Sequence, residues 1–295
     1  MYRVLPIAGL VGLACVLTGC AGALDTITSR QFRKEPFDTT YRMFKPQDPL
    51  VILWADPPKS GDERAKAMLR LQEPLTQGLT QTEQDEVMDT LAQAATVDPS
   101  PVLRLAAIAA LGRFKDARAP GILMLAYQNA TGKPDDPQPV PVARVPGAGR
   151  PPLAAPTGFA PEVVVTIRSR VLEGLGRSGR PEIIPFLASV AAGSTPGNGP
   201  EGSDDREIRL AAIRGLGVCR HPDAVVALSQ VMSADAGKDP AVTGRAHDGL
   251  VSLTGQRIPA DPARWNQVVQ AGVTIAPEPN AVDRAVHWVT EIRLP

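Results

Sequence analysis

One short pattern recurs along this chain and constrains its fold more than any other feature. Three ten-residue segments align without gaps, at 103–112, 167–176 and 208–217, and a fourth at 242–250 follows them less closely. Each has an aliphatic residue, a small or branched residue four positions later, alanine or glycine at seven, and leucine at eight. Residues spaced in this way share one face of an α-helix, so each copy is predicted to be helical.

The small residues in these columns predict close contact between helices. Alanine or glycine on a helix face lets a neighbouring helix approach, and the adjacent leucine fills the groove between them. We therefore expect the helices that carry the copies to pack against one another.

A polar turn and a second apolar segment follow each of the three closest copies. Every second segment has a leucine twelve residues after the last leucine of its copy, namely Leu123, Leu187 and Leu228. Proline is tolerated in the first turn of a helix, and it stands at the expected helix starts in Asp98-Pro99, Arg180-Pro181, His221-Pro222 and Asp239-Pro240. Such short links predict antiparallel helix hairpins.

At this level the chain resembles the HEAT-repeat family, which builds armadillo-type α-solenoids. The family's units read roughly Asp-Pro, an aliphatic residue, Arg, two residues, Ala, and Ala-Leu-Gly, and the resemblance covers residues 82–254. It implies an all-α fold, a solenoid of about four helical hairpins in which each hairpin contacts its neighbours.

The resemblance also implies a ladder between a recurrent arginine and acids in the preceding turn. We interpret it as structural rather than substrate-binding, because stacked repeats must satisfy polar groups between neighbours. Asp205 is a further candidate acid. The second position of each of the three closest copies is arginine, and we call these positions the arginine column; the fourth copy interrupts it with Thr243. The matching ladder positions are Arg104, Arg168, Arg209, Asp98 and Asp239.

The rest of the chain is expected to cap or interrupt a solenoid that spans residues 61–258. Residues 131–162 and 193–205 are rich in proline, glycine and serine, which predicts flexible insertions on the same edge of the stack. Residues 20–60 carry many aromatic residues and are expected to form an irregular cap, followed by a helix at 62–73. Residues 259–295, with Trp265 and Trp288, are expected to cap the other end.

The N-terminus has the layout of a secretory signal. Arg3 precedes an apolar run from Val4 to Val16, which is too short to span a bilayer permanently. The next four residues, Leu17, Thr18, Gly19 and Cys20, resemble the bacterial lipobox. The resemblance implies that residues 1–19 are removed and that Cys20 is lipidated, with acyl chains such as palmitate. We expect a periplasm-facing protein anchored in the cell membrane or outer membrane.

If Cys15 is removed with the signal and Cys20 is lipidated, Cys219 is the only free thiol left among the 3 cysteines. No intramolecular disulfide is then possible. The fold must be held by an ordinary hydrophobic core.

Several candidate chemical motifs lack the context that they need. Gly197 to Gly202 spell a dinucleotide fingerprint, but no strand precedes them and Pro200 lies inside. Cys219 with His221 provides too few ligands for zinc, so packing and turn roles are expected. His247 and Asp248 point to different helix faces. The acid pairs Asp135-Asp136 and Asp204-Asp205 are expected to be solvated. We predict no catalytic residues, metal or cofactor.

The charge balance, with 31 basic and 31 acidic residues, does not favour nucleic-acid binding. The leading hypothesis is an anchored adaptor for a protein partner, with no small-molecule substrate. Alternatives are a purely structural envelope element, or an enzyme or enzyme accessory related to HEAT-like bilin lyases. The enzyme alternative would gain support from a pocket lined by Arg170, Arg214 and Arg245.

Overall fold

The computed structural model describes most of the second of two compact units, which divide the chain into residues 1–48 and 49–295. All elements in the described ranges are helical, comprising eleven α-helices and one 3-10 helix, and the β pairing there is a single bridge between Gly132 and Phe159. The predicted all-α fold is confirmed for these ranges. The described residues are 47–56, 58–73, 80–132, 158–193 and 205–277.

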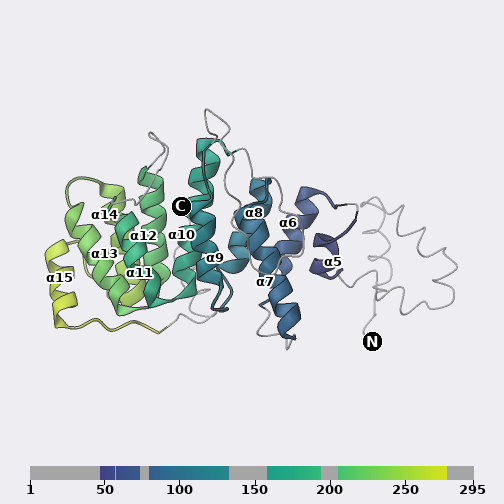
Figure 1. The fold of residues 1–295 in the computed structure, drawn as a ribbon. Helices are drawn as coiled ribbons and strands as arrows, with labels where there is room; N and C mark the ends of the chain where they lie inside the picture. Colours follow the sequence, from purple (N-terminus) through teal and green to yellow (C-terminus); the bar gives the residue numbers. More distant parts are fainter. Residues whose placement is uncertain (1–46, 57, 74–79, 133–157, 194–204, 278–295) are drawn as a thin grey trace, which may run out of the picture. The chain divides into compact units, whose positions relative to one another are not determined.

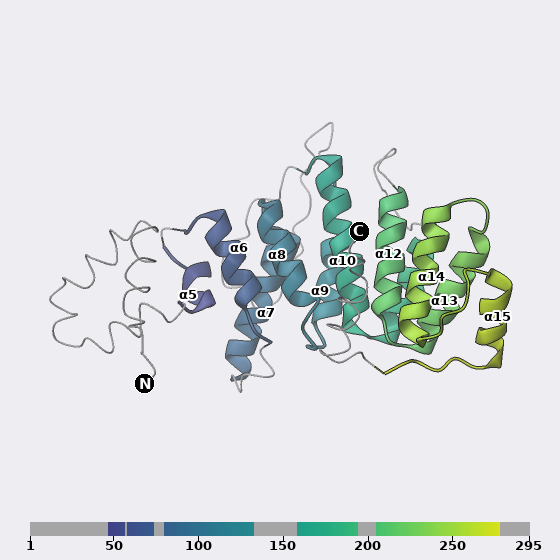
Figure 2. The ribbon, with the colours of Figure 1, turned by 180° about the vertical axis from the view of Figure 1, so that it is seen from behind.

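Alternate helices form a first series, in which each helix packs against the next (Figure 1). The four sequence copies lie on the last four of these helices, and Figure 2 shows α10, α12 and α14 side by side from behind. The series consists of α6 (Gly61–Arg70), α8 (Pro101–Leu111), α10 (Pro161–Ser178), α12 (Asp205–Val218) and α14 (Pro240–Thr254).

The intervening helices form a second series, which packs against the first, except that its last member packs on the member before it. Its members are α7 (Gln81–Thr96), α9 (Ala119–Gln128), α11 (Ile184–Ala191), α13 (Pro222–Ala234) and α15 (Pro262–Ala271), with η2 (Pro181–Ile183) leading into α11 and the short α5 (Pro49–Leu53) packing on α6. The hydrophobic core lies between the two series. The repeated leucines of both series are fully buried in it, namely Leu111, Leu123, Leu175, Leu187, Leu216 and Leu228.

The predicted close approach of the copy-bearing helices is confirmed. The last glycine of each copy lies against the small residue at position seven of the next copy, in the pairs Gly112–Gly174, Gly176–Gly215 and Gly217–Gly249. A Cβ atom added to Gly112 would lie 2.8 Å from the Cα of Gly174, and one added to Gly217 would lie 3.1 Å from the Cα of Gly249. The helices therefore meet at backbone contact, which no larger side chain permits.

Helix starts follow the predicted prolines in most cases. Asp239 is the N-cap of α14, with Pro240 as the first helical residue. Helix α8 differs, because its N-cap is Ser100 and it starts at Pro101, two residues beyond the predicted Asp98-Pro99. The Asp98 carboxylate accepts a hydrogen bond from the Ser100 N–H, so it stabilises the turn before the helix.

Several predicted boundaries shift by a few residues. Helix α6 ends at Arg70 rather than 73, ahead of Pro74, which disfavours helical backbone in the residue before it. Helix α5 replaces irregular chain at the end of the 20–60 segment. Helix α10 already begins at Pro161, inside the predicted insertion. Predictions for residues 1–46, 133–157, 194–204 and 278–295, including Trp288, lie outside the described residues.

Candidate functional site

The predicted arginine column leads to the C-terminal ends of the second-series helices. Arg104 of α8 is fully buried, and its Nε donates to the carbonyl of Asp98 at 2.7 Å, just beyond α7. Its Nη1 donates to the carbonyl of Asn129, the C-cap of α9, at 3.3 Å. The last carbonyls of a helix lack intrahelical partners and carry negative partial charge. One guanidinium therefore joins the ends of two successive second-series helices.

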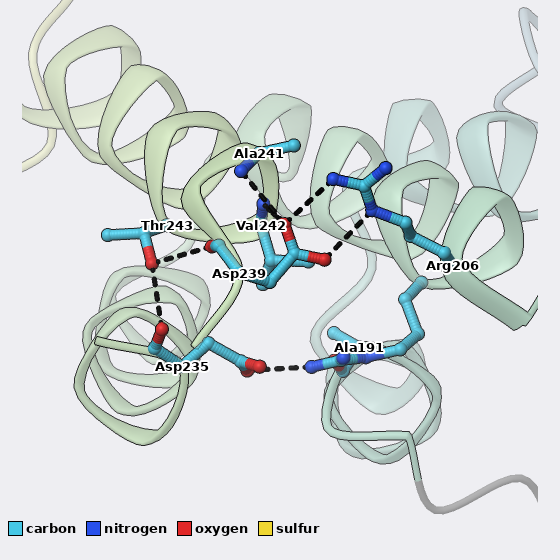
Figure 3. Close-up of polar contacts among 8 residues, drawn as sticks. Ala191, Arg206, Asp235, Asp239, Ala241, Val242 and Thr243 are labelled. Atoms are coloured by element: carbon cyan, nitrogen blue, oxygen red, sulfur yellow. Dashed lines mark hydrogen bonds and ion pairs between the residues drawn. The ribbon is translucent and has the colours of Figure 1, made fainter. Parts of the chain in front are cut away.

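Arg209 of α12 makes the equivalent contacts two pairs further along. Its Nε donates to the carbonyl of Ala191, the last residue of α11, at 3.0 Å. Its Nη2 donates to the carboxylate of Asp235, the C-cap of α13, at 2.6 Å (Figure 3). The same column position again links the C-terminal ends of two neighbouring helices.

Thr243, which interrupts the column in the sequence, still reaches the corresponding helix end. Its hydroxyl donates to the carbonyl of Asp235 at 3.2 Å or to that of Asp239 at 3.0 Å (Figure 3). Threonine, a shorter and uncharged hydrogen-bond donor, therefore takes the place of arginine in the fourth copy and contacts the end of α13. Sequence comparison of the copies could not reveal this equivalence, because threonine and arginine share no chemistry beyond donating hydrogen bonds.

Arg168 of α10 is the exception in the column. Its side chain is buried, and its guanidinium carbon lies 5.2 Å from the centre of the Tyr127 ring in the last turn of α9, a cation–π distance. Its Nε has no hydrogen-bond partner among the described residues.

Arg104 also makes a cation–π contact, because its guanidinium carbon lies 4.7 Å from the centre of the Phe159 ring. Burial lowers the pKa of Arg104 to about 10, against the opposing effect of Asp98, because the charged form loses solvation.

The ladder acids pair with arginines outside the column. The Asp98 carboxylate lies 3.4 Å from Nη2 of Arg64 in α6, and both carboxylate oxygens of Asp239 accept from Arg206 in α12, at 2.8 and 3.0 Å (Figure 3). Each acid thus links the start of one first-series helix to the first turn of the preceding one. The hydrogen bond from Arg206 is the main reason that the pKa of Asp239 falls to about 2.

A shallow groove of about 300 Å³ crosses α10, α12 and α14, and we call it the arginine groove. Three arginines, two acids, a serine, two glycines and two aliphatic residues line it. The glycines belong to the contact between α12 and α14, where the missing side chains let the two helix backbones meet. Its lining residues are Glu173, Arg177, Ile213, Arg214, Gly217, Val218, Arg245, Asp248, Gly249 and Ser252.

Arg214 is held within this groove by two carboxylates. Its Nε donates to Glu173 of α10 and its Nη2 to Glu207 of α12, both at 2.8 Å. Burial alone would lower the pKa of Arg214, but the hydrogen bonds that it donates to Glu207 and Glu173 outweigh burial and raise the pKa overall. Glu173 also accepts from Arg170 at 3.1 Å. Arg214 therefore has a fixed position and a charge that is already compensated.

Arg177 and Arg245 are held much more loosely. Arg177 lies 3.9 Å from Glu173, and Arg245 lies 3.7 Å from Asp248. Neither guanidinium makes a hydrogen bond within the described residues, and the side chains are 47% and 48% exposed. Exposed ion pairs at such distances contribute little stability, so both cations can accept new partners.

Two of the three arginines whose presence in one pocket would support the enzyme alternative lie together. Arg214 and Arg245 line the groove, whereas Arg170 contacts Glu173 without being part of the lining. Arg177 and Glu173 were missed by the sequence analysis. Their spacing with Arg170, at i, i+3 and i+7 along α10, is the signal that could have found them.

The packing and turn roles predicted for Cys219 and His221 are confirmed. Cys219 is fully buried, and burial raises the pKa of its thiol to about 11. Nδ1 of His221 accepts from the backbone N–H of Asp223 at the start of α13. Nε2 of His247 lies 2.7 Å from the carbonyl oxygen of Ile258 in the loop before α15, whereas Asp248 is exposed.

The remaining sequence candidates cannot be placed. Residues 17–20, Asp135-Asp136, Asp204 and the segment 197–202 lie outside the described residues, as does the side chain of Asp205. Within the described part of the chain, no group of three His, Cys, Asp or Glu residues is arranged to hold a metal ion. No helix there has the length and apolar character needed to cross a bilayer.

Comparisons of the chain with protein-family models, with curated proteins and with solved structures found no match. The function is therefore argued from the geometry of the helices and the arginine groove.

Proposed function

We propose that this protein is a HEAT-like α-solenoid that serves as a membrane-anchored, protein-binding adaptor in the bacterial cell envelope. The solenoid arrangement is supported by contacts that recur from copy to copy. The three glycine pairs join successive first-series helices, and Arg104, Arg209 and Thr243 reach equivalent ends of second-series helices. Recurrent contacts between neighbours are the organising feature of repeat proteins.

The arginine groove is the observation that supports adaptor function. It spans three successive helices of the first series, so a partner bound there contacts elements that are separate in the chain, at 161–178, 205–218 and 240–254. The backbone contact between Gly217 and Gly249 holds α12 and α14 in a set position, while Arg177 and Arg245 keep uncommitted donors at the surface. A rigid scaffold with adaptable polar groups is suited to recognition of another protein.

Anchoring rests on the lipobox-like residues Leu17, Thr18, Gly19 and Cys20. A multiply acylated cysteine would hold the protein at the membrane, because each buried CH₂ contributes about 0.8 kcal/mol. Mass spectrometry of the mature N-terminus should find a lipid on Cys20 and none in a Cys20→Ala variant. An intact N-terminus that retains Met1 in the wild-type protein would contradict the anchor.

A second candidate is an enzyme or enzyme accessory that takes an anionic ligand. It is favoured by the presence of both Arg214 and Arg245 in the groove lining. Two of the Arg214 donors are already bonded to Glu173 and Glu207, however, and the groove is open. These features suit a docking surface better than an enclosed reaction site.

Site-specific photo-crosslinking in the envelope tests the adaptor function. Val218 lies in the groove lining and is 46% exposed, so a benzoylphenylalanine at this position should capture a reproducible protein partner. Val102 is similarly exposed, at 51%, but lies outside the groove lining on α8, and it provides the matched control. Failure of Val218 to give any adduct beyond those seen at Val102 would count against the adaptor.

A further inference from the structure

We propose that the arginine groove recognises an acidic segment of the partner, with a carboxylate bound between Arg177 and Arg245 and an aliphatic side chain against Val218. This inference rests on the proposed adaptor function and specifies the chemistry of the partner.

The first argument is the distribution of charge in the groove. The lining contains three arginines, Arg177, Arg214 and Arg245, and two acids, Glu173 and Asp248, so the lining itself carries a net positive charge. Glu173 is already committed to Arg214 by a hydrogen bond of 2.8 Å. Arg214 also bonds Glu207 outside the lining, so Arg177 and Arg245 keep only long ion pairs, at 3.9 and 3.7 Å. These two arginines lie on α10 and α14, on either side of α12.

The second argument is the state of these two guanidinium groups. Each has five N–H donors, and none of these makes a hydrogen bond within the described residues. A carboxylate can accept two parallel hydrogen bonds from one guanidinium, or one from each of two. Because both side chains are only about half exposed, a partner carboxylate would gain charge-assisted hydrogen bonds in a site that is partly shielded from water.

The third argument is the apolar surface next to the arginines. Val218 is 46% exposed on α12, one of the few exposed large hydrophobic residues in the described ranges, and Ile213, Gly217 and Gly249 line the same groove. Ile213 is fully buried, so Val218 is the aliphatic side chain of the lining that an apolar group of the partner can cover. Covering Val218 would stabilise the complex through the hydrophobic effect.

The groove favours a protein segment over a lipid surface. Anionic membranes are recognised by clusters of four to eight basic residues that act together on a broad surface. Here three arginines alternate with two acids in a space of about 300 Å³, which is sized for a few side chains. A single acidic side chain beside an aliphatic one matches this pattern.

A synthetic peptide serves as the probe, because the partner is unidentified. A fluorescein-labelled octapeptide of alternating glutamate and leucine is titrated with the full chain in a neutral detergent, and binding is followed by fluorescence anisotropy. The glutamate peptide should bind at least about tenfold more tightly than analogues with glutamine or lysine in place of glutamate, and added NaCl should weaken it. Equal binding of the glutamine peptide would overturn the inference.

Paired variants test the location of the site. Arg177→Gln/Arg245→Gln should reduce affinity for the glutamate peptide about tenfold, whereas Arg257→Gln/Arg264→Gln should change it less than about twofold. The control removes the same charge from exposed arginines outside the groove lining. Both variants should retain the wild-type melting temperature, because all four side chains lie at the surface. Equal loss of affinity in the two variants would overturn the proposed site.

The failure of this inference can be told apart from failure of the adaptor function. If Val218 still captures a partner in the Arg177→Gln/Arg245→Gln background with unchanged yield, the adaptor stands and acidic recognition is wrong. If the peptide binds through Arg177 and Arg245 but no partner is captured, acidic recognition stands and the adaptor function is wrong. Binding to phosphatidylglycerol vesicles without peptide binding would overturn the inference in favour of a lipid surface.

Discussion

Gly176 of α10 lies against Gly215 of α12 so closely that a methyl group on Gly176 would overlap the carbonyl group of Gly215. The contact is reciprocal, because a Cβ on Gly215 would lie 2.6 Å from the carbonyl oxygen of Leu172 in α10. Two helix backbones thus meet directly at this point. The separation of α10 and α12, and with it the position of Glu173 relative to Arg214, depends on the absence of two side chains.

Gly215→Ala should therefore destabilise the protein by about 1–3 kcal/mol, because backbone atoms cannot move aside as a flexible side chain can. Urea unfolding followed by circular dichroism at 222 nm would measure the change. The same substitution should weaken peptide binding at the arginine groove, since α10 and α12 both line it.

Gly244→Ala is the matched control for this prediction. Gly244 lies inside α14, and an added Cβ would meet nothing within 4 Å. Alanine favours helix over glycine by about 1 kcal/mol, so this variant should be as stable as the wild type or more stable. If Gly215→Ala were also as stable as the wild type or more stable, helix propensity rather than helix contact would dominate at Gly215.

Arg104→Met should destabilise the protein by about 1–3 kcal/mol, because the buried carbonyl of Asp98 and the partly buried carbonyl of Asn129 would lose a donor. Methionine retains much of the apolar stem, so the loss reports mainly on the guanidinium. Arg113→Met is the control, since Arg113 also donates to a backbone carbonyl, that of Leu69, but at the surface. Its effect should stay within about 0.5 kcal/mol. Thermal unfolding of both variants would decide the matter.

Asp239→Asn should reduce stability near neutral pH and flatten the loss of stability in acid. The pKa of Asp239 is lowered to about 2 from its ordinary 3.8, chiefly by the hydrogen bond from Arg206. Its contribution is therefore present above about pH 4 and is lost as the pH falls through about 2. Asparagine can still cap α14, so the substitution isolates the charge.

Melting temperatures of wild type and Asp239→Asn at several values between pH 7 and pH 2 would test this expectation, and the two curves should converge in acid. Asp261→Asn is a suitable control, because Asp261 also caps a helix but contacts its arginine, Arg264, only at 3.5 Å. Curves for Asp239→Asn and wild type that remain parallel down to pH 2 would contradict the role of Arg206.

Cys219 should react very slowly with Ellman's reagent in the folded protein at pH 8. The side chain is fully buried, and its pKa is raised to about 11, so little thiolate is present or accessible. In urea, a mature chain with lipidated Cys20 should titrate a single thiol, whereas an unprocessed chain would titrate all 3 of its cysteines. Rapid reaction of the native protein would contradict the burial of Cys219.

Much of the fold could be predicted because the helix pattern is local. The i, i+4, i+7, i+8 spacing predicted four helices, and the buried leucines at 111, 175 and 216 occupy the expected faces. The start of α8 was misplaced because Asp98-Pro99 and Ser100-Pro101 are equally good starting signals. Only the hydrogen bonds of the folded turn select the second.

The candidate site was predicted less completely. Arg214 and Arg245 were singled out, but Arg177 and Glu173 were not. A groove across α10, α12 and α14 combines residues from three helices, and its lining depends on how those helices pack. The partners of Asp98 and Asp239 were also out of reach, because Arg64 and Arg206 lie in the preceding first-series helices.

The sequence by itself determined the helices, their pairing, the small residues at their contacts and the positions of the arginine column, because each depends on residues within a few turns of one another. The tertiary structure alone decided what those residues touch. Arg104 and Arg209 reach groups at helix ends rather than the carboxylates of Asp98 and Asp239, and Thr243 does the same with a shorter side chain. Which groups these side chains contact depends on the distances between helices. Those distances are set by contacts such as that between Gly176 and Gly215.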